Sequence, residues 1–542
     1  MSCKGIKMIE KLVNLSKSLK QYLSHQTSKF TAVILSVFMV FIYLLSYKII
    51  KKFYYSFIKI DSYVFIMEEY FFTFYCISTL PIFFFLFFKF NICTKFWDKL
   101  EKPHLIDYIY FTVICLFLFL SFNHYDLTLT SAQGKGLLDL ICHGMNILNF
   151  YDYHQNLAAY LLPQYIIFGI WSIPVKLVYM LIGLQSIGIN ELLRINGFTL
   201  WWYKLLPTLF YIGSALIIYK ICIQLNFDKN KAKWICFVFF IFPMATFSQF
   251  IFGQYDSIGL FFELIMIYYF LKRKQLMATI FCMIAITLKA FPIFIFIPLL
   301  LLFEKKIWKI VVYIGIVFSG YLFFNLLFSD SKAFSSSINF NKGMFNRLLA
   351  VGINTSFGVI YLFLLFFIFI CVFAYFINLK DENELIIKKY IMYIPLLVYS
   401  LFFSFVLFHP QWILILVPYL VINVFLNKNN KYMMFIIIVA SIGFLFSIVD
   451  IPFWYNDVDA VMVNLGIFPK IYGFYNGVDL NMIDSGVYPS TFGFNMSEGK
   501  SLSRLVSING LIPSNVYFTF FVSMLFINLI LSFPNKKKYY KE

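Results

Sequence analysis

Three aspartates and three histidines lie in one part of this sequence, residues 123–203: they are Asp126, Asp139, Asp152, His124, His143 and His154. Asp126 follows a long apolar run closely, which predicts that a membrane helix ends beside it. A carboxylate there is partly desolvated and suits general-base chemistry, although a solvated loop acid or a helix N-cap is the structural alternative. Asp139 and His143 are candidate substrate-binding residues. His and Asp together also suit a divalent metal, but their spacings match no standard metal motif, so we expect none.

A second polar motif, Gly253-Gln254-Tyr255-Asp256, separates two apolar runs. Gly253 permits a tight turn, and Asp256 with the following Ser257 suits an N-cap of the next helix. The functional interpretation places Gln254 and Asp256, with Tyr255 beside them, in an external cavity where a substrate binds.

Cations form the third candidate group. Lys289 lies far from either polar end of the apolar stretch 276–303, so it needs a lipid phosphate or a neighbouring aspartate as a partner, unless it snorkels to the interface. Arg194 and Arg347 are two of only four arginines in the chain, and guanidinium groups bind phosphate through two hydrogen bonds at once. We therefore expect these three cations to bind a phosphorylated substrate.

The elements that position these residues are membrane helices. Of the 542 residues, 61% are hydrophobic and 13% are charged. Soluble domains carry about 45–50% apolar and about 25% charged residues, so the composition excludes a soluble enzyme, a nucleic-acid factor and a disordered chain. The net charge of +18 comes largely from lysines in short turns between apolar runs, as the positive-inside rule expects, and indicates no nucleic-acid partner.

Apolar runs long enough for a bilayer core of about 30 Å predict the membrane spans. The candidates are 30–47, 71–90, 106–122, 204–224, 234–250, 257–271, 308–327, 355–378, 390–408, 411–426, 432–449 and 515–533. Lysine-rich turns assign the cytoplasmic side for most of them, at 229–233, 272–274, 305–309, 380–389, 428–431 and 536–538. The orientation of the first two spans stays open, because lysines flank them on both sides.

The apolar stretch 276–303 fits this scheme only as a broken pair, about 277–288 and 291–303, because one full crossing would move Lys305 outside. The turn at 289–292 then lies near the outer side of the membrane. Non-helical backbone at membrane depth is tolerated where it lines a polar cavity, so we expect Lys289 to face a pocket.

The predicted organisation is an all-α polytopic membrane protein of about 13–14 transmembrane helices. Within it, the apolar stretch 160–183 lies on the outer face as a helix broken by Pro163 and Pro174. The predicted parts are a cytoplasmic basic amphipathic segment (1–29), N-terminal transmembrane helices (30–122), an external catalytic loop (123–203), a transmembrane core (204–449), an external loop (450–514), and a last transmembrane helix with a basic cytoplasmic tail (515–542).

The stretch from Phe252 to about residue 304, FGQYDSIGLFFELIMIYYFLKRKQ…ITLKAFPIFIFIPLLLLFEKK, resembles integral-membrane glycosyltransferases of the GT-C class, especially bacterial mannosyltransferase-type members. The shared order is a GQxD turn, a downstream membrane lysine and a Pro-Leu-Leu run. Two further segments, LAAYLLPQYIIFGIWSIP and LWWYKLL, are similar to the part that follows the first catalytic loop, so the resemblance covers roughly residues 105–425.

This resemblance implies a GT-C-like bundle with jaw helices in the first large external loop. It implies transfer of a hexose from a polyprenyl-phosphate-sugar donor to a cell-envelope glycan or lipid acceptor, by inverting displacement at the extracytoplasmic face of the cell membrane and without a cofactor. Asp126 matches the acidic group of the first external loop, with Asp139 as the alternative. Asp256 matches the second acidic position, and Lys289 matches the basic residue near the donor phosphate.

Two other functions fit the same features. A flippase or transporter of lipid-linked saccharides would also use many helices and external cations, although carriers commonly show duplicated halves and this sequence shows none. A glycan polymerase or ligase with lipid-diphosphate donors would depend more on external arginines than on Asp126. The large and asymmetric external loops favour the glycosyltransferase.

Overall fold

The computed structural model describes residues 79–449 and 514–534, apart from residues 81, 93, 99, 122–124, 154–159, 182–196, 254, 338–345 and 380–381. The segment 1–29, the span predicted at 30–47 and nearly all of the loop 450–514 lie outside the described residues.

Five helices among the described residues are long and apolar enough to cross a membrane, or six if one bent pair counts as a single span. The five are α10 (Gly197–Gln224), α16 (Ile307–Leu327), α19 (Glu384–Phe405), α21 (Asn430–Val449) and α26 (Ser514–Ser532). The predicted all-α polytopic membrane fold is confirmed, whereas the total of 13–14 transmembrane helices stays a prediction.

The span predicted at 234–250 is bent. It consists of α11 (Lys229–Ile241), which meets the following helical segment Pro243–Ile251 at an angle of 48°. Pro243 explains the bend, because it has no N–H to continue the helix and suits only the first turn of the next one.

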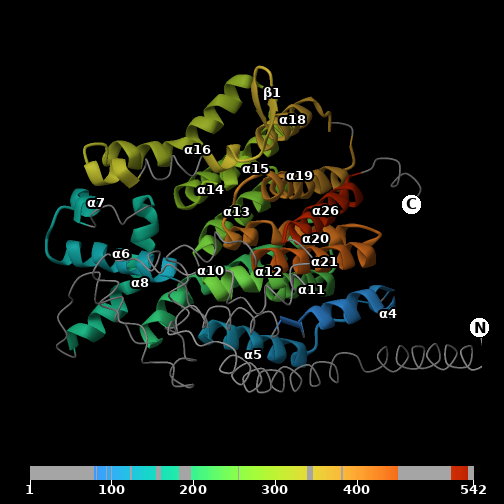
Figure 1. The fold of residues 1–542 in the computed structure, drawn as a ribbon, viewed down its shortest axis with the longest axis horizontal. Helices are drawn as coiled ribbons and strands as arrows, with labels where there is room; N and C mark the ends of the chain where they lie inside the picture. Colours follow the sequence, from blue (N-terminus) through green and yellow to red (C-terminus); the bar gives the residue numbers. More distant parts are fainter. Residues whose placement is uncertain are drawn as a thin grey trace, which may run out of the picture.

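Helices α6 (Tyr125–Cys142), α7 (Phe150–Tyr153) and α8 (Leu162–Leu181) lie together at one end of the molecule, and α4 (Thr94–Asp98) lies at the other (Figure 1). The remaining elements are η1 (Phe88–Ile92), α5 (Leu105–Ser121), η2 (Ile147–Asn149), α12 (Pro243–Thr246), η3 (Phe247–Phe252), α13 (Asp256–Leu271), α14 (Gln275–Leu288), α15 (Pro292–Phe303), η4 (Arg347–Leu349), β1 (Gly352–Thr355), β2 (Gly358–Tyr361), α18 (Leu362–Phe376), η5 (Pro410–Ile415) and α20 (Val417–Leu426).

Helix α8 is continuous, so the expectation that Pro163 and Pro174 break it is wrong. Pro163 stands in the first turn, where the missing N–H has no intrahelical partner to lose. Pro174 removes one backbone hydrogen bond in the interior, but the helix packs along its length against α6, and that contact holds the two halves in one line.

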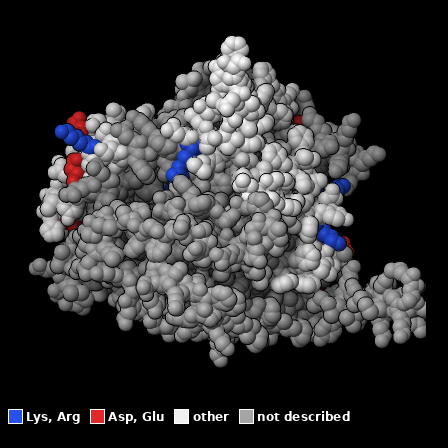
Figure 2. All heavy atoms as spheres, viewed as in Figure 1, with Lys and Arg blue, Asp and Glu red and all other residues white. Residues whose placement is uncertain are grey.

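The span predicted at 355–378 begins as a hairpin, which is the second departure from the expected helices. Strands β1 and β2 pair antiparallel, with Thr355 opposite Gly358, and Gly358 adopts a φ of +145° that only glycine accepts readily. The β-branched Ile353 and Ile360 favour the strands on either side of this turn. The hairpin projects at the top of Figure 1, and the projection is formed by uncharged residues in Figure 2.

A buried carboxylate fixes the middle of α13, the helix whose first residue is Asp256. Glu263 is fully buried, and its two carboxylate oxygens accept hydrogen bonds of 2.6 Å from the hydroxyls of Tyr399 in α19 and Tyr419 in α20. A buried carboxylate without donors is costly, so these two bonds fasten α13 to both neighbours and hold its N-terminal end in place.

Two glycines bring α6 and α8 into close contact. A Cβ on Gly134 would lie 2.3 Å from Phe168 Cβ and 3.0 Å from the Gly169 backbone nitrogen. The first distance is too short for two carbon atoms, so one of the helices would have to move. Small residues permit such close helix approach in membrane proteins. The crossing therefore depends on the absence of a side chain at position 134.

We expect Gly134→Ala to lower the free energy of unfolding by about 1–3 kcal/mol, because the added methyl group forces the two helices apart. Thermal unfolding in detergent, followed by tryptophan fluorescence, measures the effect. Gly315→Ala in α16 is the matched control, since a Cβ there meets nothing within 4 Å. Equal unfolding midpoints for the two variants would contradict the close crossing.

Candidate functional site

The predicted break in the membrane stretch 276–303 is confirmed. Helix α14 ends at Leu288, Lys289 is extended with φ −150° and ψ 132°, and α15 begins at Pro292. Proline at the first helical position explains where α15 starts. The stem of Lys289 packs on α13 at Gly259, where a Cβ would lie 3.3 Å from Lys289 Cβ. The turn therefore directs Lys289 across the face of α13.

Lys289 forms an ion pair with Asp256. Its Nζ lies 2.8 Å from Asp256 Oδ1, and the two side chains are 11% and 2% exposed. The neighbouring aspartate that the sequence analysis named as one possible partner of Lys289 is therefore its partner. Removing either charge alone would leave the other one buried, so the pair acts as a unit.

Two tyrosine rings flank the ammonium group of Lys289. The Nζ atom lies 4.9 Å from the ring centroid of Tyr160 and 4.7 Å from that of Tyr255, and the two rings meet edge to face. Aromatic faces attract a cation, most strongly where water is excluded. Tyr255 was predicted at this site, whereas Tyr160 was not.

The turn before α13 serves the ion pair and does not cap the helix. Gly253 has a φ of +60°, which confirms the tight turn expected there. The N-cap of α13 is Tyr255, and no side-chain oxygen caps it. Ser257 Oγ instead donates a hydrogen bond of 2.8 Å to the carbonyl oxygen of Pro207, so the cap expected from Asp256 and Ser257 is wrong. The carboxylate of Asp256, the first residue of α13, pairs with the buried Lys289.

Asp126 stands in the first turn of α6, and its side chain lies outside the description. The next residue, Leu127, is fully buried in the same apolar cluster as Tyr255 and Leu288, which adjoin the two members of the ion pair. The first turn of α6 is therefore a near neighbour of the Asp256–Lys289 pair.

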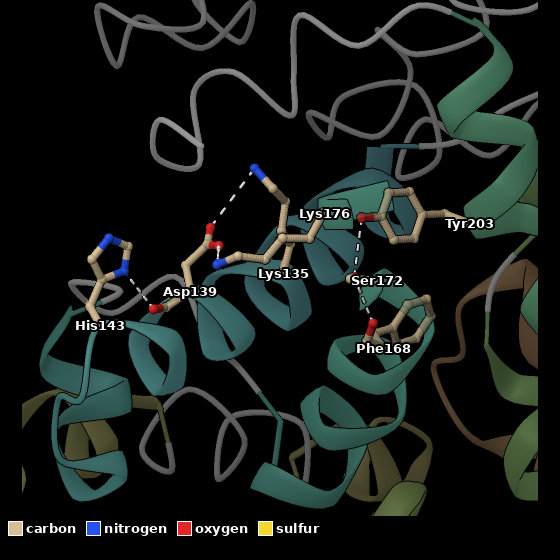
Figure 3. A network of polar contacts seen from close by, with 7 residues as sticks. All are labelled: Lys135, Asp139, His143, Phe168, Ser172, Lys176 and Tyr203. Carbon is tan, nitrogen blue, oxygen red and sulfur yellow. Dashed lines mark hydrogen bonds and ion pairs between the residues drawn. The ribbon is translucent and has the colours of Figure 1, made fainter. Parts of the chain in front are cut away.

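Asp139 belongs to a separate polar network at the other end of α6 (Figure 3). Its carboxylate lies 2.6 Å from Lys176 Nζ and 3.8 Å from Lys135 Nζ, and all three side chains are largely buried. Burial lowers the pKa of Lys176, but the hydrogen bond and charge of Asp139 outweigh it and raise the pKa above its usual value. His143 contacts the backbone carbonyl oxygen of Asp139, at 2.7 Å, and not the carboxylate.

The distance along α6 separates the two candidate bases. Asp126 and Asp139 are 13 residues apart in one helix, which is about 20 Å along its axis. Leu137, near Asp139, packs in a different apolar cluster with Phe150 and Tyr165. One reacting atom cannot contact both carboxylates.

Two aromatic rings connect Arg347 to the break between α14 and α15. Its guanidinium carbon lies 5.9 Å from the ring centroid of Trp412, and Trp412 packs at 4.7 Å on Phe291, which is part of the turn that contains Lys289. The structure thus brings Arg347, Lys289, Asp256 and Tyr255 to one region. Gln254 and Arg194 lie outside the described residues.

Sequence reasoning missed several polar residues that the structure adds. Lys204 is a buried lysine inside the apolar run LWWYKLL, and this isolation in an apolar run was the signal that was available. Lys135 and Lys176 pair with Asp139 from positions that no motif marks. Among the residues that the structure describes, no three His, Cys, Asp or Glu side chains gather as metal ligands.

Comparison with known proteins gives one match. Residues 192–404 match the family model of glycosyltransferase family 87, a region that includes Asp256, Lys289 and Arg347, whereas Asp126 precedes it. The match supports a multi-pass membrane glycosyltransferase, and it confirms the predicted resemblance over this part of the chain. No curated protein and no solved structure matches the chain.

Proposed function

We propose that this membrane glycosyltransferase transfers a hexose from a polyprenyl-phosphate-sugar donor to a cell-envelope glycan or lipid acceptor, at the extracytoplasmic face of the cell membrane and within a GT-C-like bundle. The observation that carries the proposal is the buried Asp256–Lys289 pair at a helix break inside the region that matches the glycosyltransferase family. Broken helices that expose charges at membrane depth suit a substrate with a charged head and an apolar tail.

The reaction needs a base and a cation. The acceptor hydroxyl oxygen forms a bond to the anomeric carbon of the sugar, while the bond from that carbon to the phosphate oxygen breaks. Asp126 takes the proton of the acceptor hydroxyl, and Lys289 neutralises the charge that develops on the departing phosphate. Attack from the face opposite the phosphate inverts the anomeric configuration.

Asp126 is the better base for this reaction than Asp139. Leu127, beside Asp126, packs with Tyr255 and Leu288, so the first turn of α6 adjoins the cation that would receive the phosphate. The Asp139 carboxylate is occupied by Lys176 and Lys135 about 20 Å away along the helix. We propose that Asp139 and His143 stabilise the packing of the external helices and take no part in the reaction.

Asp256 and the two tyrosines hold Lys289 ready for the donor. Asp256 pairs with the ammonium and orients it before a donor arrives. The rings of Tyr160 and Tyr255 exclude water beside Nζ. Arg347, held on Trp412, supplies a second cation for the phosphate.

The donor class is tested with the purified chain in nanodiscs, radiolabelled polyprenyl-monophosphate mannose or glucose, and a cell-envelope extract as acceptor. We expect label to move into the extract from a monophosphate donor. Transfer only from polyprenyl-diphosphate sugars would replace this proposal with the polymerase or ligase. No transfer from any donor, together with movement of lipid-linked saccharide across proteoliposome membranes, would replace it with the flippase.

A further inference from the structure

Lys204 occupies a position between two helix ends. It lies in α10 and is 1% exposed, yet its Nζ donates hydrogen bonds to three backbone carbonyl oxygens. These are the carbonyl oxygens of Phe250 at 2.6 Å, Phe119 at 2.9 Å and Leu118 at 3.5 Å.

Both groups of carbonyls belong to the last turn of a helix. Leu118 and Phe119 lie in the last turn of α5, which ends at Ser121, and Phe250 lies in the last turn of η3, which ends at Phe252. Carbonyl groups at helix C-termini lack intrahelical partners and carry the negative end of the helix dipole. One ammonium group therefore satisfies and neutralises two helix ends at once.

The chain continues from each of these ends into an acidic residue of the proposed site. Asp126 follows Ser121 by five residues, and Asp256 follows Phe252 by four. The stem of Lys204 also packs on the second turn, where a Cβ on Gly253 would lie 3.0 Å from Lys204 Cε. Lys204 thus contacts the turn at Gly253 directly, and it bonds to the end of α5, which precedes Asp126 in the sequence.

The residues around Lys204 are themselves fixed. Trp202 and Trp171 of α8 stack at 4.7 Å, and each indole N–H donates to the other residue's carbonyl oxygen, at 3.0 and 2.8 Å. Tyr203 donates from its hydroxyl to Ser172 Oγ at 3.1 Å (Figure 3). Trp201 donates to the Leu120 carbonyl oxygen at the same end of α5 as the bonds from Lys204, at 3.3 Å. This part of α10 is a rigid base from which Lys204 acts.

We infer that Lys204 is a positioning residue that sets the end of α5, which precedes Asp126, relative to the turn at Gly253, which precedes Asp256. The inference rests on the proposed function, because it assigns Lys204 its role through these two carboxylates. A misplacement of about 1 Å between a base and a reacting centre costs roughly a hundredfold in rate, so the spacing between the end of α5 and the turn at Gly253 affects turnover.

The main variant is Lys204→Met, which keeps an apolar stem against Gly253 and loses the ammonium group. Lys204→Arg keeps the charge and N–H donors and is expected to restore part of the effect. Lys220→Met is the matched control, because Lys220 lies on the same helix and is exposed. If Lys204→Met does not fold, Lys204→Gln, which keeps N–H donors on a shorter side chain, is measured in its place.

Hydrogen–deuterium exchange of the full chain in nanodiscs gives the first readout and needs no substrate. In Lys204→Met we expect at least fivefold faster exchange, as an order of magnitude for an opened helix end, in peptides that cover 118–126 and 250–256, with α19 unchanged. Wild-type exchange in both peptides would overturn the inference. Faster exchange throughout the chain would also overturn it, since Lys204 would then be a general stabilising residue.

Kinetics with radiolabelled polyprenyl-phosphate mannose give the second readout. We expect kcat of Lys204→Met to fall roughly tenfold or more while KM for the donor changes less than about threefold, because the carboxylates move but the donor cation stays. A rise in KM with unchanged kcat would overturn the inference. If the wild type transfers nothing from this donor, the proposed function fails, and the exchange result still decides whether Lys204 holds the end of α5 and the turn at Gly253 together.

Discussion

Asp126→Asn is expected to lower transfer of the sugar roughly a thousandfold or more, with the fold of the chain unchanged. Asparagine keeps the size and the hydrogen-bonding capacity of the side chain, but it does not accept the proton of the acceptor hydroxyl. General-base catalysis contributes about 10²–10⁴-fold, and the loss of the carboxylate removes all of it. Initial rates with labelled lipid-linked donor measure the effect, and equal unfolding midpoints show that the fold is intact.

Two further aspartates of the same region, residues 123–203, serve as comparisons. Asp152 is exposed and accepts a hydrogen bond of 2.9 Å from Ser331 Oγ, so Asp152→Asn is expected to keep transfer near the wild-type rate. Asp139→Asn leaves Lys135 and Lys176 without their carboxylate and is expected to lower transfer less than tenfold, by loosening the contact between α6 and α8. A thousandfold loss at Asp139→Asn with near-normal transfer at Asp126→Asn would move the base to Asp139.

The apolar membrane helices and the break at Lys289 can be predicted from the sequence, because the local composition decides both. Long apolar runs have few alternatives in lipid, and the lysine-rich turns oblige the stretch 276–303 to turn back. Pro292 then marks where the second half starts, and a lysine left at such a turn needs a counter-charge. A neighbouring aspartate was one of the two expected partners for that reason, but the sequence did not indicate which one.

The contacts that complete the site depend on pairings between distant parts of the chain. Tyr160 reaches Lys289 across 129 positions of sequence, and Lys204 bonds to residues 85 and 46 positions away, at Phe119 and Phe250. No spacing rule connects such residues, since their approach depends on how α6, α8 and α10 pack. Pro174 shows the same limit, because its effect on α8 is decided by the packing of α6 and not by the proline alone.

The hairpin at β1 and β2 was missed for a local reason. Residues 355–378 are apolar enough for a span, and hydropathy alone does not distinguish a helix from a short strand pair in such a run. Gly352 and Gly358 were the available signals, since glycine inside an apolar run commonly marks a turn or a close backbone approach.

The Asp256–Lys289 pair gives the second large effect, on stability and on activity together. Lys289→Met leaves the Asp256 carboxylate buried without its counter-charge, and it is expected to lower the free energy of unfolding by about 3–5 kcal/mol. It also removes the cation for the leaving phosphate, and loss of one such group costs roughly 10²–10³-fold in kcat. Lys388→Met is the matched control: its ion pair with Glu384 is 2.9 Å long, but that carboxylate is 69% exposed, so we expect little change in the unfolding midpoint and normal transfer.

The double variant Asp256→Asn with Lys289→Met separates the two effects. With both charges gone, no uncompensated charge is buried, so most of the lost stability is expected to return, and the midpoint of thermal unfolding measures this recovery. Transfer is expected to stay at the low rate of Lys289→Met, because the cation that neutralises the phosphate is still missing. If transfer recovers together with stability, Lys289 serves only to balance Asp256, and the cation for the phosphate must be sought elsewhere, first at Arg347. If stability does not recover, the pair contributes more than charge balance, and the aromatic contacts of Lys289 with Tyr160 and Tyr255 are the remaining source of that stabilisation.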